Sequence, residues 1–425
     1  MTTPDVAAHT LYRPGQRWAY LAVLFLVATS NYLDRNIISV LLEPIKREFG
    51  VSDTMLGLLT GAAFTVTYSV LGVPVARWAD RGNRRTIVTL ALTVWSAMTA
   101  LCGLAQTFWQ LALARVGVGV GEAGALPPSQ SLLVDYFPPS QRARALSIFM
   151  SAASAGYILG FVLGAHIAAT QGWRAAFLIV GLPGLGLALL TAFVLPEPRQ
   201  RLGLPAGAGG AEPMVATFKA LWRKPTYRCT VIGITAYAFF AYGAAIFAPS
   251  FMVRVLQVPM AQVGTLYGGL SALTAVIGTL LGGWLADRLA TRDPRWLLRL
   301  PALGLLLAFP FYFAAYMLRD FTWVLIVSAP AGVLLSAAIP AVFAGSHAVC
   351  GSKRRATSVA ILLFMMSMLG TTLGPLVTGV LSDALKPYYG VESLAYALAA
   401  MTSMMLVCSH FFWRASRTLV QDTEP

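Results

Sequence analysis

The chain has 425 residues, of which 57% are hydrophobic and only 11% are charged. A soluble domain carries about a quarter charged residues, so this composition excludes a large soluble enzyme and indicates a polytopic membrane protein. The formal net charge of +14 would suggest nucleic-acid binding in a soluble protein. The placement of the basic residues, given below, argues against a nucleic-acid partner here.

A helix needs about 20 apolar residues to cross a bilayer, and the sequence contains twelve stretches of this kind. The predicted fold is therefore an all-α polytopic membrane protein with twelve transmembrane helices in two six-helix bundles. The predicted spans, in chain order, are 17–42, 53–79, 86–106, 107–136, 143–170, 173–195, 226–256, 260–290, 295–317, 320–348, 353–384 and 390–414.

The stretch "EPRQRLGLPAGAGGAEP" separates the sixth span from the seventh and divides the chain into two halves. Residues 213–224 mix apolar and basic side chains, which predicts a short helix on the membrane surface. The predicted domains are a cytoplasmic tail (1–16), an N-terminal six-helix bundle (17–195), a cytoplasmic linker with the surface helix (196–225), a C-terminal six-helix bundle (226–414) and a cytoplasmic tail (415–425).

The distribution of Lys and Arg predicts the orientation. With both termini inside, 23 of the 31 basic residues fall on the cytoplasmic side, six in outer loops and two inside spans. This asymmetry follows the positive-inside rule and explains the net charge as topology. The chain also lacks an Asn-x-Ser/Thr glycosylation sequon. We therefore expect a protein of the bacterial inner (cytoplasmic) membrane.

Two loop sequences repeat at matching places in the halves. "VARWADRGNRR" follows the second span and "GGWLADRLATR" ends the eighth, so each offers an Asp-Arg pair at a helix end. Carboxylates there stabilise helix N-termini and arginines bind carboxylates or phosphates. We interpret the pairs as a latch that holds one conformational state of the protein closed. The alternative is that they are ordinary basic loops of the positive-inside pattern. The latch residues are Asp80, Arg81, Arg84, Arg85, Asp287 and Arg288.

These loop motifs resemble those of the major facilitator superfamily. The second copy matches the family pattern, whereas the first departs from it at Ala76 and at Gly82-Asn83. Within the superfamily the chain resembles the Spinster group of lysolipid and sphingosine-1-phosphate transporters, in a bacterial form. The stretches that carry this resemblance are "NYLDR" (31–35), "RVGVGVGEAG" (115–124), "YFPPSQRARALSIF" (136–149) and "GWRAAFLIVGLPGL" (172–185). The resemblance implies two bundles around a central cavity lined by the first and fourth helices.

Four charged side chains lie deep inside the predicted spans: Asp34, Arg35, Arg115 and Glu122. Each costs about 2.5–3.5 kcal/mol at the centre of a membrane helix, which favours a function. With a helical rise of about 1.5 Å per residue, Asp34 and Arg115 lie at matching depth and could form a pair. We predict that Asp34 and Glu122 carry protons, while Arg115 and Arg35 bind the anionic group of a substrate, with Glu122 also contacting it. The alternative is a static ion pair that holds the two helices together.

Glycines mark two helices. Gly156, Gly160 and Gly164 have the spacing of closely packed membrane helices. A second glycine run beside Glu122, followed by Pro127 and Pro128, predicts a bend.

The C-terminal half has almost no buried charge but many aromatic residues, so its wall of the cavity would suit an apolar tail. The further substrate-binding candidates are Tyr68, Tyr157, Tyr237, Tyr242, Tyr267 and His347. For any one of them, a core or lipid-facing position is the alternative.

These observations predict a proton-coupled secondary transporter of lysophospholipid-like or sphingosine-1-phosphate-like amphiphiles that works by alternating access as a monomer, with protons and membrane lipids as its other partners. A symporter of small organic anions, a multidrug exporter and a gradient-independent lipid scramblase are the alternatives. No Walker motif, Cys/His metal-ligand spacing or Ser/His/Asp grouping is found, so we expect a proton gradient instead of a cofactor, no metal and no enzymatic activity.

Overall fold

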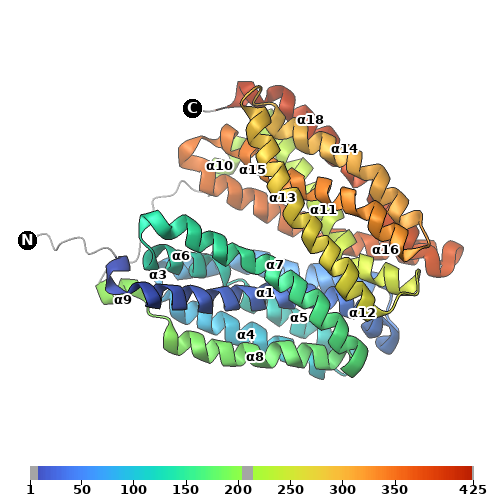
Figure 1. Ribbon diagram of the computed structural model, residues 1–425, viewed down its shortest axis with the longest axis horizontal. Helices are drawn as coiled ribbons and strands as arrows, with labels where there is room; N and C mark the ends of the chain where they lie inside the picture. Colours follow the sequence, from blue (N-terminus) through green and yellow to red (C-terminus); the bar gives the residue numbers. More distant parts are fainter. Residues whose placement is uncertain (1–7, 203–213, 424–425) are drawn as a thin grey trace, which may run out of the picture. The chain divides into compact units, whose positions relative to one another are not determined.

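A computed structural model describes residues 8–202 and 214–423, and all regular secondary structure in these ranges is helical (Figure 1). The chain forms two compact units. The first unit comprises Met1–Ile45 and Ala63–Gly209, and the second comprises Lys46–Ala62 and Gly210–Pro425. This division follows the two predicted halves except at Lys46–Ala62, which is grouped with the second unit.

The first unit is built from long helices joined by short turns. Figure 1 shows α4 beside α5 and α8, in the cyan-to-green part of the colour bar. Its elements are η1 (Ala8–Leu11), α1 (Pro14–Phe49, whose last four residues belong to the second unit), α3 (Ala63–Arg81), α4 (Arg84–Leu104), α5 (Phe108–Glu122), α6 (Leu126–Tyr136), α7 (Pro139–Gln171), α8 (Trp173–Val194) and α9 (Pro198–Leu202).

In the second unit α15 packs against α13 and α14, and α11 packs against α16 and α18 (Figure 1). Three elements of this unit, η2, η3 and η4, are π-helical. Its elements are α2 (Asp53–Gly57), η2 (Leu58–Ala62), α10 (Met214–Trp222), α11 (Pro225–Arg254), α12 (Met260–Gln262), η3 (Val263–Tyr267), α13 (Gly268–Ala290), α14 (Trp296–Met317), α15 (Phe321–Met365), η4 (Met366–Thr371), α16 (Thr372–Tyr389), η5 (Gly390–Glu392), α17 (Ser393–Met401) and α18 (Met404–Asp422).

Local sequence explains several helix ends. Asn83 and Thr107 accept hydrogen bonds from the backbone N–H groups of Thr86 and Gln110, which caps α4 and α5. Gly50, with φ of 64°, ends α1 in the left-handed conformation that favours glycine. Two helices run further than the sequence predicts. The predicted loop at 349–352 is part of α15, and α18 continues to Asp422.

Close approach between α1 and α7 depends on the predicted glycine stripe. A Cβ atom at Gly156 would meet the backbone of Thr29 at 2.6 Å, and one at Gly160 would meet the carbonyl of Leu33 at 3.0 Å. These glycines therefore let the two helices pack nearly backbone to backbone, as small residues do in membranes.

Nine helical stretches of the described residues are long and apolar enough to cross a membrane. Large apolar side chains remain exposed along them, among them Phe193 (85% exposed) and Leu189 (62% exposed). Such apolar outer surface is suited to contact with lipid acyl chains.

Candidate functional site

The four buried charges predicted from the sequence come together in the first unit. Asp34 and Arg35 are neighbours on α1, and Arg115 and Glu122 lie on α5. Consecutive residues of a helix point about 100° apart, so Asp34 and Arg35 face different partners. The result is two separate ion pairs between the same two helices.

The first pair joins Asp34 and Arg115. Arg115 Nη1 lies 3.1 Å from Asp34 Oδ1, and both side chains are 1% exposed. The second carboxylate oxygen of Asp34 accepts a hydrogen bond from the hydroxyl of Thr99 on α4. This geometry holds a carboxylate between a charged and a neutral donor, away from water. A removal of one partner would leave the other charge buried and unpaired.

The second pair joins Arg35 and Glu122, where Arg35 Nε donates to Glu122 Oε2 over 2.5 Å. The Arg35 side chain is 23% exposed, whereas that of Glu122 is fully buried. Two aromatic rings of α3 face the same guanidinium: its Cζ lies 4.3 Å from the centroid of Tyr68 and 5.3 Å from that of Phe64. The structure therefore places Tyr68, a predicted substrate-binding residue, directly against the charged site.

Phe64 also contacts the other arginine, because Arg115 Cζ lies 5.3 Å from its ring centroid. One buried ring thus touches both cations. The negative face of an aromatic ring attracts guanidinium groups at this separation. Phe64 therefore links the Asp34–Arg115 pair to the Arg35–Glu122 pair.

Glu122 sits where the helix breaks. It is the last residue of α5, and tight turns at Ala123–Ala125 lead into α6, whose first turn contains Pro127 and Pro128. Upstream, Gly121 has no room for a side chain because a Cβ there would meet the backbone N of Trp95 at 2.5 Å. The predicted bend is confirmed, and it places a carboxylate at a point where the backbone is not locked into a continuous helix.

Several polar atoms of this site have no hydrogen-bond partner in the structure. They are Glu122 Oε1, Arg35 Nη2 and Arg115 Nε. The side-chain oxygen and nitrogen of Asn31, one turn before Arg35 on α1, also lack a hydrogen-bond partner. Buried polar groups without partners cost about 1–3 kcal/mol each, so their retention needs a reason. An anionic group bound by Arg35 and Arg115 would supply acceptors for the two arginine atoms.

The remaining predicted binding residues are divided between the two units. Tyr157 belongs to α7 and stacks on Phe161 with ring centroids 4.5 Å apart. The second unit contains Tyr237 and Tyr242 on α11, Tyr267 in η3 and His347 on α15. Tyr242 is 46% exposed, and His347 Nε2 is buried without a hydrogen-bond partner. Their role in binding stays a prediction.

Among the predicted latch residues, Arg84 has the most extensive contacts. Its side chain is 1% exposed and contacts Glu197 (Nη2 to Oε1, 2.6 Å), Asp135 (2.7 Å) and the hydroxyl of Ser131 (2.9 Å). All of these partners belong to the first unit.

The other latch residues are less informative. Arg85 is half-buried, and Asp287 and Arg288 are exposed, with Arg288 Cζ 5.3 Å from the ring centroid of Trp284. The side chains of Asp80 and Arg81 lie outside the described residues.

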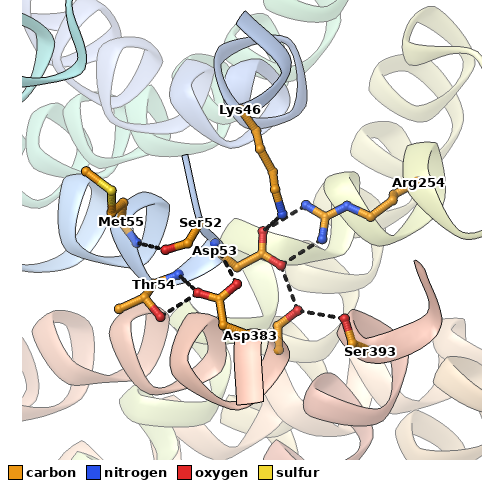
Figure 2. A network of polar contacts seen from close by, with 9 residues as sticks. Lys46, Ser52, Asp53, Thr54, Met55, Arg254, Asp383 and Ser393 are labelled. Atoms are coloured by element: carbon orange, nitrogen blue, oxygen red, sulfur yellow. Dashed lines mark hydrogen bonds and ion pairs between the residues drawn. The ribbon is translucent and has the colours of Figure 1, made fainter. Parts of the chain in front are cut away.

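Sequence reasoning missed Thr99, Phe64 and a charged network around Asp53. Thr99 gives no sequence signal because a lone threonine is common in a membrane helix. Phe64 and Tyr68 do show one, an aromatic pair four residues apart on one helix face. Asp53, Lys46, Arg254 and Asp383 all stand near ends of predicted spans, where charges are unremarkable, and only the fold brings them together (Figure 2).

Long apolar helices and a buried set of paired charges, as the described residues show, are typical of membrane transporters. Within the described residues, no group of His, Cys, Asp and Glu side chains could hold a metal ion. The sequence over residues 24–375 matches the Major Facilitator Superfamily, and the chain belongs to this family of membrane transporters.

The chain is similar to an MFS-type efflux pump of Mycolicibacterium smegmatis, with 36% identity and 99% of both chains covered. It is also similar to the human protein spinster homolog 1, with 30% identity over 92% of this chain and 78% of the relative. Among solved structures, a bacterial homolog of the human lysosomal transporter Spinster, in an inward-facing and unoccupied conformation, matches with a TM-score of 0.89 and 31% identity, covering 97% of this chain and all of the other. The resemblance to the Spinster group predicted from the sequence is confirmed.

Proposed function

We propose that this protein is a proton-coupled secondary transporter of single-chain amphiphilic lipids with an anionic head, working by alternating access in the bacterial inner membrane. The observation that carries the proposal is the double ion pair of Asp34–Arg115 and Arg35–Glu122 inside the first unit. Similarity to Spinster proteins supports a transporter, and the lipid class of the cargo is what the resemblance to the Spinster group implies.

The proposed topology has twelve crossings in two six-helix bundles, with both termini cytoplasmic. Nine candidate spans are found in the described residues, and one of them, Thr357–Asp422, contains 66 residues and the turn Gly390–Glu392, so it counts twice. α1 has 36 residues, enough to cross although Asp34 and Arg35 interrupt it, and α5 with α6 makes one further crossing. Together these crossings make up the proposed twelve.

The proposed coupling exchanges a proton against an ion pair. When Glu122 is ionised, it neutralises Arg35 and leaves little charge for a substrate. When Glu122 takes a proton, Arg35 loses its carboxylate partner and its free Nη2 can donate to a phosphate or carboxylate head. Asp34 and Arg115 can make the same exchange, because a proton on Asp34 would free Arg115 to bind the anionic head. Protonation and binding of the anionic head would then favour each other.

A multidrug exporter of the same fold is the second candidate function, because one relative over the full length is named an efflux pump. An exporter of apolar drugs would need no cation for an anionic head. The two candidates therefore differ in whether Arg35 and Arg115 contact the cargo.

The test is reconstitution into liposomes with an imposed pH gradient. A lysophospholipid, sphingosine-1-phosphate, a sugar acid and a cationic dye are offered in parallel to the wild type, Asp34→Asn and Glu122→Gln. We expect gradient-dependent movement of the anionic amphiphiles, which both variants lose. Glu392→Gln, which removes an exposed carboxylate paired with Arg319, is the control.

Each other outcome supports a different function for this protein. Transport of the dye alone supports the exporter, and transport of the sugar acid alone supports an organic-anion symporter. Lipid movement that ignores the gradient supports a scramblase. If both variants keep the wild-type pH dependence, the charges are a static contact and the coupling proposal is wrong.

A further inference from the structure

Exposed arginines gather in the second unit, where α11 begins and α18 ends. Arg228 lies in the first turn of α11, and Arg414 and Arg417 lie near the end of α18. The two helix ends meet there, because the side-chain hydroxyls of Thr226 and Thr418 are 2.7 Å apart. We call the surface formed by the three arginines the basic face.

The basic face continues into an apolar surface along the same two helices. Arg228 and Arg414 both act electrostatically on the Cys229 thiol of α11, which places them on the same side of the helix pair. One turn further into α11, Ile232 is 38% exposed, and on α18 Leu406, two turns before Arg414, is exposed to the same extent. Between these limits of α18 the exposed residues recur every three or four positions and form one stripe, which consists of Leu406, His410, Trp413, Arg414 and Arg417.

None of the three arginines has a carboxylate partner among the residues that the structure describes, whereas Arg319 of the same unit pairs with Glu392. The acidic residue of α18, Asp422, is used elsewhere, because its carboxylate accepts a hydrogen bond from the backbone N–H of Thr226 over 2.9 Å. Such a contact stabilises the start of α11. Like charges that share one face repel one another, so the basic face favours a bound anion.

An exposed tryptophan lies beside the arginines. Trp413 precedes Arg414 on α18 and is 38% exposed. On its other side Arg299 of α14 has its Cζ 5.9 Å from the ring centroid, and Asp293 holds this arginine with an ion pair of 3.2 Å. The ring is therefore fixed by a neighbouring helix while one part of it stays accessible. Tryptophan is enriched where membrane helices reach the lipid headgroups, which indicates the depth of the basic face.

We propose that the basic face is a binding site for the headgroup of an anionic membrane phospholipid. The planar guanidinium groups of the three arginines bind its phosphate through paired N–H donors, and Trp413 packs beside the glycerol backbone. The acyl chains follow the exposed apolar side chains of Ile232 and Leu406 along the two helices. A soluble anion would match the arginines but would not use this apolar continuation, which favours a lipid. Basic pockets between membrane helices bind headgroups of this kind.

The test is native mass spectrometry of the full-length protein in a non-ionic detergent, titrated with phosphatidylglycerol or with phosphatidylcholine of the same acyl chains. We expect the wild type to bind phosphatidylglycerol about a hundredfold more tightly, because each arginine near an anionic headgroup contributes about fivefold. Arg228→Gln, Arg414→Gln and Arg417→Gln should each weaken the binding of phosphatidylglycerol by about fivefold. The triple variant R228Q/R414Q/R417Q should bind the two lipids equally.

Arg144→Gln is the matched control. Arg144 is also exposed and also faces a tryptophan, with its Cζ 5.3 Å from the ring centroid of Trp18, but it lies on α7 of the first unit. This variant should keep the affinity of the wild type for phosphatidylglycerol. A loss equal to that of Arg414→Gln would show that the lipid is attracted to any basic surface, and the proposed site would be wrong.

Unchanged affinity for phosphatidylglycerol in the folded triple variant overturns the site. If that variant does not fold, as judged by thermal unfolding without lipid, the three single variants decide the question in the same way. Glycerol phosphate that binds the wild type as tightly as phosphatidylglycerol would show that a soluble anion is the occupant, which also overturns the proposal. Arg35 and Arg115, the cations proposed for the cargo, belong to the first unit and stay unchanged, so the result is independent of the proposed function.

Discussion

Arg35 and Glu122 are 87 residues apart in the chain, yet Arg35 Nε lies 2.5 Å from Glu122 Oε2 across α1 and α5. The other carboxylate oxygen of Glu122 has no partner. A carboxylate that uses only one oxygen in an ion pair keeps a place for a proton. Its position at the break between α5 and α6 means that a change of its charge can change the local backbone.

Replacing Glu122 by Gln should uncouple transport from the proton gradient. The amide keeps the size of the side chain but cannot gain or lose a proton, so the rate of transport should become flat with pH while exchange of substrate across the membrane continues. Gradient-driven accumulation in liposomes should fall to the level reached without a gradient. A variant that keeps the wild-type pH profile would assign the proton to another group.

Asp34 and Arg115 should behave as a unit in stability. Arg115→Met leaves the Asp34 carboxylate buried and unpaired, and we expect a loss of about 3–5 kcal/mol in the free energy of unfolding. The double variant D34N/R115M removes both charges and should recover most of that loss, because no lone charge remains. Thermal unfolding in detergent compares the wild type, Asp34→Asn, Arg115→Met and the double variant. Losses that simply add would show that the two side chains are not coupled.

The pairing of α1 with α5 could be predicted from the sequence because Asp34, Arg35, Arg115 and Glu122 stand out among apolar residues. Their depth followed from the helical rise alone. Consecutive side chains of a helix point about 100° apart, so Asp34 and Arg35 need different partners. This angle explains why the four charges form two ion pairs.

The Asp53 network shows the limit of the same reasoning. Asp53 and Arg254 are 201 residues apart, and Asp53 and Asp383 330. Charges at the ends of spans are ordinary, so neither spacing nor composition singles them out. The grouping of Lys46–Ala62 with the second unit depends on packing between distant helices, and on glycines whose neighbours the sequence does not reveal.

Phe64 should stabilise both arginines through its ring face. Phe64→Leu keeps an apolar side chain of similar size but removes the ring, and cation–π contacts contribute about 0.5–2 kcal/mol each. We expect a loss of about 1–2 kcal/mol in the free energy of unfolding. Phe64→Tyr, which retains the ring, should stay close to the wild type. Equal stability of the leucine and tyrosine variants would show that Phe64 only fills space.

Arg84 should act as a structural clamp of the first unit. The sequence interpretation assigns it to a conformational latch, but its partners Glu197, Asp135 and Ser131 all lie in the same unit. Glu197 also accepts a hydrogen bond from the Arg84 backbone N–H over 2.7 Å, which fixes the start of α4 to the segment between α8 and α9. Glu197→Gln should lower the free energy of unfolding by about 1.5–3 kcal/mol, the range for hydrogen bonds to charged groups.

The half-buried neighbour Arg85 supplies a control, since Arg85→Gln removes a charge next to Arg84 in the same helical turn and should change stability by no more than about 0.5 kcal/mol. The clamp and the latch differ in a second readout. A clamp leaves the distance between spin labels placed on the two units unchanged once the protein is folded, whereas a latch shifts that distance toward a second population. A shift in folded Glu197→Gln without loss of stability would therefore assign Arg84 to the latch and refute the clamp.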